Sequence, residues 1–95
     1  MAKIEIGNYV GIPCSVSAGP FEDEVLVEFD TLDGKVSGFA QLEDITQMGG
    51  QRYIRGKILS IGRDSMSVMV NGSFFTTNGL AHVSQRSVES LPLAA

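Results

Sequence analysis

Apolar and polar side chains alternate along most of this sequence with a period of two residues, the pattern of a β-strand that buries one face. Residues 24–30 (EVLVEFD) and 65–70 (SMSVMV) follow it most clearly. Asp33-Gly34 and Asn71-Gly72 add dipeptides that favour the positive φ angles of hairpin turns. The sequence therefore predicts an all-β protein, with a short helical turn around 41–48 as its one exception. The side chains that we expect to face the core are Val25, Val27, Phe29, Ile58, Ile61, Val68, Val70, Leu80 and Val83.

The length of the chain and its cysteine content indicate one domain over residues 1–95. A separate fold of about 45 residues would bury too little apolar surface to be stable without disulfides or a metal. Cys14 is the only cysteine, so an intrachain disulfide is excluded, and Cys14 with His82 cannot supply four metal ligands. We therefore expect no metal and no cofactor. We also expect the two halves of the chain either to share one core or to be stabilised by contact with a partner.

The two halves of the chain resemble one another. GIPCSV in the first half aligns with GKILSI in the second, and GFAQL aligns with GLAHV. A glycine-rich joint at 47–51 separates the copies. These matches predict a small barrel, or paired barrels, formed by two related three-stranded repeats at about 9–46 and 52–90.

Two adjacent phenylalanines interrupt the second repeat. Phe74 aligns with Val36 and is expected to face the core, whereas Phe75 belongs with Thr76 and Thr77 to an insertion that the first repeat lacks. Neighbouring side chains on a strand point to opposite faces, so Phe75 needs a separate explanation. It is either a contact residue on a loop or strand edge, or a cap over the end of the barrel or the seam between the halves.

The second half also resembles a known family. The segment GKILSIGRDSMSVMVNGSFFTTNGLAHVSQ is similar to the OB-fold RNA-binding domain that recurs in the largest small-subunit ribosomal protein. Gly79, Leu80, His82, Val83 and Ser84 match the ending of that pattern. Tudor-like and KOW-like small barrels would show a similar sequence pattern. Both resemblances imply a protein that binds and does not catalyse.

The distribution of charge favours a nucleic-acid partner for the second half. The whole chain carries a net charge of −4, but its acidic residues lie mostly before residue 46 and its basic residues mostly after it. Single-stranded RNA or DNA requires cations near its phosphates and flat rings against its bases. The residues that we expect to supply them are Arg52, Arg55, Lys57, Arg63, Phe74, Phe75, His82 and Arg86. The plainer interpretation is a solvated strand face with scattered charges.

Protein interaction is the alternative function. The acidic loop EDE follows Pro20 and an apolar tip, and such loops steer encounters with basic partners. Strand edges in a chain of this kind can also pair with another protein or with a second copy. In this alternative, the binding residues are Phe21, Glu22, Asp23 and Glu24.

Motifs of catalysis and targeting are not found in the sequence. Neither GxSxG, HExxH nor GxxxxGK[ST] occurs, so we do not expect an enzyme. The N-terminal residues lack the apolar run of a signal peptide, and no 18-residue apolar stretch could span a bilayer. A cytoplasmic protein without membrane contact is the default expectation.

The ending Leu93-Ala94-Ala95 is similar to a bacterial degradation tag.

Overall fold

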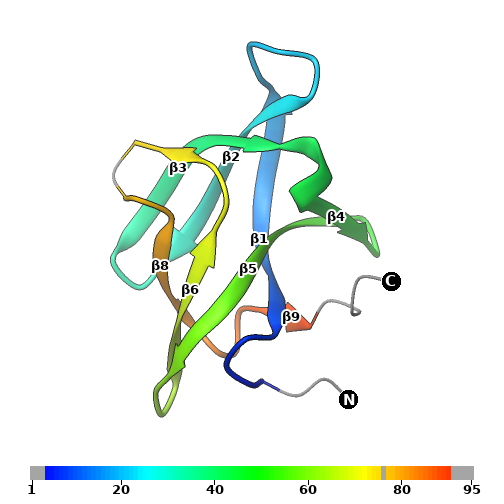
Figure 1. Ribbon diagram of the computed structural model, residues 1–95. Coiled ribbons are helices and arrows are strands. Elements are labelled where there is room, and N and C mark those ends of the chain that lie inside the picture. Colours follow the sequence, from blue (N-terminus) through cyan, green and yellow to red (C-terminus); the bar gives the residue numbers. More distant parts are fainter. Residues whose placement is uncertain (1–3, 76, 91–95) are drawn as a thin grey trace.

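The computed structural model describes residues 4–75 and 77–90, and strands make up most of this part of the chain (Figure 1). The prediction of an all-β protein is therefore confirmed. Thr76 and the Leu93-Ala94-Ala95 ending lie outside the described residues. In chain order the elements are β1 (Tyr9–Ala18), β2 (Glu24–Thr31), β3 (Gly34–Gln41), the 3-10 helix η1 (Leu42–Asp44), β4 (Ile45–Met48), β5 (Gln51–Ile61), β6 (Ser65–Val70), β7 (Ser73–Phe74), β8 (Leu80–Ser84) and β9 (Glu89–Ser90). The helical turn expected around 41–48 is confined to η1, because β4 follows it at once.

The strands form one curled antiparallel sheet in the order β7-β3-β2-β1-β5-β6-β8, with β4 beside β5 and β9 beside β1. The long strand β1 pairs with different strands along the two halves of its length. Its second half, Ser15–Ala18, pairs with β2, whereas its first half, Tyr9–Cys14, pairs with β5. Each predicted repeat thus supplies three consecutive antiparallel strands, β1-β2-β3 and β5-β6-β8, on the two sides of the β1–β5 pair. The duplication itself stays a prediction.

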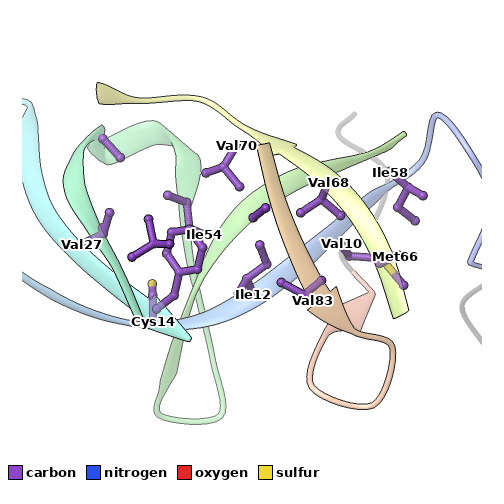
Figure 2. Packing of buried hydrophobic residues seen from close by; sticks show 14 of the residues in the cluster. Val10, Ile12, Cys14, Val27, Ile54, Ile58, Met66, Val68, Val70 and Val83 are labelled. Atoms are coloured by element: carbon purple, nitrogen blue, oxygen red, sulfur yellow. The ribbon is translucent and has the colours of Figure 1, made fainter. Parts of the chain in front are cut away.

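Side chains from both halves of the chain pack into one core. Figure 2 shows side chains of β1, β2, β5, β6 and β8 pointing into the same interior. The alternation seen in the sequence accounts for this arrangement, because every second residue of each strand faces inward. The predicted core residues that prove to be buried are Val25, Val27, Phe29, Ile58, Val68, Val70 and Val83. The described residues contain no helix long and apolar enough to cross a membrane.

Two predicted core residues are wrong, because Ile61 is 41% exposed and Leu80 is 51% exposed. On β8 the inward positions are Ala81 and Val83, so Leu80 must point outward with the opposite parity. Ile61 is the last residue of β5 and lies beyond a register irregularity of the β5–β6 pair between Ile58 and Ser60. It pairs with the buried Met66, so its exposure reflects its place at the end of the strand, outside the closely packed part of the core.

A short strand, β7, closes one edge of the curled sheet. Asn71-Gly72 was predicted to be a hairpin turn, but it joins strands that do not pair with each other: β6 pairs with β8, and β7 pairs with β3. Gly38 on β3 makes this closure possible, because a β-carbon there would overlap the backbone of Phe74. On the other side, the Leu32 amide donates to the His82 carbonyl oxygen at 2.8 Å, which ties the end of β2 to β8. Asp33-Gly34 does form the predicted β2–β3 hairpin.

Candidate interaction surface on the outer face of the sheet

A row of partly exposed side chains crosses four neighbouring strands on the outer face of the sheet. Tyr9 of β1 lies opposite Lys57 of β5, Lys57 lies opposite Met69 of β6, and Met69 lies opposite Leu80 of β8. Residues directly opposite each other in a sheet lie on the same face, so these four side chains form one line. All four are exposed to solvent. We call this row the outer stripe.

The outer stripe continues at Leu80 into an open pocket beside the β7–β8 connection. This pocket has a volume of about 460 Å³ and is lined by Phe74, Phe75, Thr77, Asn78 and Leu80. Exposed aromatic and apolar side chains thus occur together with polar ones, Lys57 among them, from β1 to the edge that β7 closes. Exposed apolar side chains gathered in this way on one face make it a candidate binding site.

The two adjacent phenylalanines have different roles. Phe74 packs against the core, with its ring edge-to-face on the buried Phe29 at a centroid distance of 5.8 Å. Phe75 is 68% exposed, and it leans on Phe39 in a similar edge-to-face contact at 5.8 Å. Its amide donates to the Ser37 carbonyl oxygen at 3.0 Å, which holds this part of the chain against β3. Phe75 is therefore an ordered aromatic ring presented to solvent.

Arg55 is held by an internal ion pair. Its Nη2 lies 2.8 Å from Oδ1 of Asp44, whose side chain is buried. The guanidinium carbon also lies 5.1 Å from the centre of the Tyr9 ring. This geometry neutralises much of the charge of Arg55 and orients Tyr9 at one end of the outer stripe. Arg55 is therefore a structural residue more than a free contact for phosphate.

Two further cations, Arg63 and Arg86, lie toward one end of the outer face, whereas Lys57 lies in the outer stripe itself. The Gln85 amide donates to the Asp64 carbonyl oxygen at 2.9 Å, so the β5–β6 turn with Arg63 and the chain that follows β8 with Arg86 meet at the same end. His82 lies between this end and Leu80, with Nδ1 at 3.9 Å from the Asp33 carboxylate. Lys57, Arg63, His82 and Arg86 are thus on or beside the outer face.

Several predicted site residues lie elsewhere. Arg52 shares the inner face of β5 with Ile54, and Phe74 faces the core. Phe21, Glu22, Asp23 and Glu24 lie at or beside the β1–β2 connection, whereas the outer stripe crosses β1 at its first residue. The ten residues of β1 separate these two places by roughly 30 Å at the usual rise of a strand. The acidic loop and the outer stripe are therefore distinct surfaces.

Cys14 and His82 point to opposite faces of the sheet, so they do not form a nucleophile–base pair. Cys14 is on the inner face, and burial raises the pKa of its thiol from 9.0 to about 11. A thiol of this kind is protonated and unreactive near neutral pH. Within residues 4–75 and 77–90, no three His, Cys, Asp or Glu side chains are grouped so that they could hold a metal ion.

Comparison with protein-family models, with curated proteins and with solved structures finds no match for this chain. The resemblance to OB-fold, Tudor-like and KOW-like domains therefore stays a prediction. Sequence reasoning missed Tyr9, Met69 and Leu80 as a common surface. The alternation in GLAHV could have placed Leu80 outside, because it puts Ala81 and Val83 on the other face. The alignment of Leu80 with Met69 and Lys57 depends on strand register, which the sequence does not show.

Proposed function

We propose that this protein is a non-catalytic protein-interaction module that binds its partner through the outer stripe and the adjoining Phe75 pocket. The observation that carries the proposal is the register of Tyr9, Lys57, Met69 and Leu80, which places exposed side chains side by side on four strands. The outer face of the curled sheet thereby offers a partner one contact area that crosses four strands.

The chemistry of the surface supports a protein partner. Tyrosine, methionine and phenylalanine are enriched in protein interfaces, and the outer stripe and its pocket contain all three. Met69 and Leu80, which lie between Lys57 and the Phe75 pocket, offer no ring on which a base could stack. With the exposed cation of Lys57 in the stripe, the best complement is an apolar patch with an acidic group beside it.

Paired variants test the proposal. Leu80→Glu places a charge where the outer stripe meets the Phe75 pocket, whereas Leu32→Glu places one at the β2–β3 turn, at a side chain that is 60% exposed. We expect partners recovered with the wild-type protein by cross-linking and affinity capture to be lost with Leu80→Glu and retained with Leu32→Glu. The same recovered set for all three proteins would contradict the proposal.

Single-stranded nucleic acid is a second candidate, favoured by the position of Lys57, Arg63, His82 and Arg86 on or beside one face. Anisotropy with labelled oligo-uridine at low and high salt tests it. Binding through these cations should weaken steeply with salt and should be reduced by Lys57→Glu with Arg63→Glu. A signal that does not depend on salt would contradict this function.

A further inference from the structure

The structure contains a second hollow surface, on the inner face of the sheet at the end of the barrel beside η1. This groove has a volume of about 500 Å³. Its lining is divided between polar and apolar side chains, and the apolar ones come from four different elements. The apolar lining residues are Val16 and Ala18 of β1, Val25 of β2, Leu42 of η1 and Ile45 of β4. Mouths of small barrels with walls of this kind are common ligand sites.

Two polar side chains lie next to each other in the groove. Gln47 of β4 is directly opposite Arg52 of β5, and Arg52 is directly opposite Cys14 of β1. Gln47 and Arg52 both line the groove. Arg52 lies two residues from Ile54 on β5, so its side chain is on the same inner face. Its guanidinium therefore lies where the apolar interior meets solvent.

The charge of Arg52 is not compensated within the described part of the chain. No ion pair or side-chain hydrogen bond of its guanidinium occurs among residues 4–75 and 77–90, and Arg52 is the only charged residue that lines the groove. The neighbouring Cys14 does not supply an anion, because burial raises the pKa of its thiol to about 11. The guanidinium therefore keeps all five of its N–H donors for water or a ligand.

We propose that this groove binds an aliphatic carboxylate. The apolar chain of the ligand lies on Val16, Val25 and Ile45, and its carboxylate accepts hydrogen bonds from the Arg52 guanidinium and the Gln47 side-chain amide. An Arg–carboxylate pair at an apolar wall selects for a ligand that combines both features. The same chemistry is found in a free fatty-acid-like molecule and in the carboxyl terminus of a peptide that ends in an apolar residue. The inference is independent of the proposed function, since it concerns the inner face.

Calorimetric titration with octanoate and 1-octanol separates the contribution of the charge from that of the chain. We expect octanoate to bind at least about tenfold more tightly than 1-octanol, because a hydrogen-bonded charged group contributes about 1.5–3 kcal/mol. Arg52→Met should lower the affinity for octanoate by about ten- to hundredfold, which is the same contribution expressed as a ratio. Lys57→Met removes an exposed cation from the outer face of the same strand and should leave the affinity unchanged.

A pair of peptides distinguishes the two sources. An acetylated peptide ending in Val-Leu is titrated with a free carboxyl terminus and with an amidated one. A preference for the free carboxylate that Arg52→Met abolishes would assign the groove to peptide termini, whereas binding of octanoate alone would assign it to small amphiphiles. Equal affinities for charged and uncharged probes, an unchanged affinity in Arg52→Met, or binding of none of the four probes would overturn the proposal. Thermal melting of Arg52→Met should match the wild type, because the replaced side chain has no internal partner to lose.

Discussion

Replacing Arg55 by methionine is expected to destabilise the fold by about 2–3 kcal/mol. The substitution keeps an unbranched side chain over Tyr9 but removes the charge partner of Asp44. Asp44 is only 5% exposed, so its carboxylate would be left buried without a cation. A hydrogen bond to a charged group contributes about 1.5–3 kcal/mol, and the cation–π contact with Tyr9 adds about 0.5–1 kcal/mol at an exposed position. The Arg55 side chain is 35% exposed, so water replaces part of what is lost. The expected effect therefore falls in the lower part of the summed range.

Urea unfolding of four proteins measures this coupling: the wild type, Arg55→Met, Asp44→Asn and the double variant. Asp44→Asn removes the buried charge that Arg55 compensates, so the double variant should be clearly more stable than the sum of the two single effects predicts. Arg55→Lys keeps a charge but not the guanidinium geometry and should recover part of the loss. A free energy of unfolding for Arg55→Met within about 0.5 kcal/mol of the wild type, or strict additivity in the cycle, would refute the reasoning.

Three further predictions concern other parts of the structure. Phe74→Ala should lower the free energy of unfolding in urea by about 2–3 kcal/mol, because it empties a half-buried site against Phe29. Phe75→Ala should lower it by less than about 1 kcal/mol. Equal losses of stability would contradict the assignment of the two rings to opposite faces. The raised pKa of Cys14 means that the unfolded thiol ionises near pH 9 while the folded one stays protonated to about pH 11, so stability should fall between these values by up to about 3 kcal/mol. This loss is measured as the difference between the wild type and Cys14→Ala, and a difference that does not change with pH would refute it. Gly38→Ala should destabilise the protein by about 1–3 kcal/mol and detach β7, because a β-carbon at this position overlaps the β7 backbone. Detachment is measured as loss of hydrogen-exchange protection at the Phe75 amide, and unchanged protection would count against the close approach.

The candidate surfaces illustrate which kinds of residue sequence reasoning can recognise. Phe75 was identified as a residue without a core position, because the first repeat has no counterpart for it, and it is exposed beside the outer stripe. Arg52 and Arg55 were grouped as contacts for phosphate, yet one lines the inner groove and the other is paired with Asp44. Charge alone could not separate these two arginines, but their spacing could have done so. They lie three residues apart on one strand, and an odd separation sends them to opposite faces.

The all-β class, the β2–β3 turn and most of the core could be predicted from the residues alone, because alternation with a period of two is a local property of each strand. The tertiary structure alone decided how strands that are distant in the chain lie together. The pairing of β1 with β5 and of β7 with β3 depends on long-range register and on the close approach at Gly38. Both candidate surfaces are products of that register. The outer stripe and the Arg52 groove each combine side chains from several strands, and only folding brings those strands side by side.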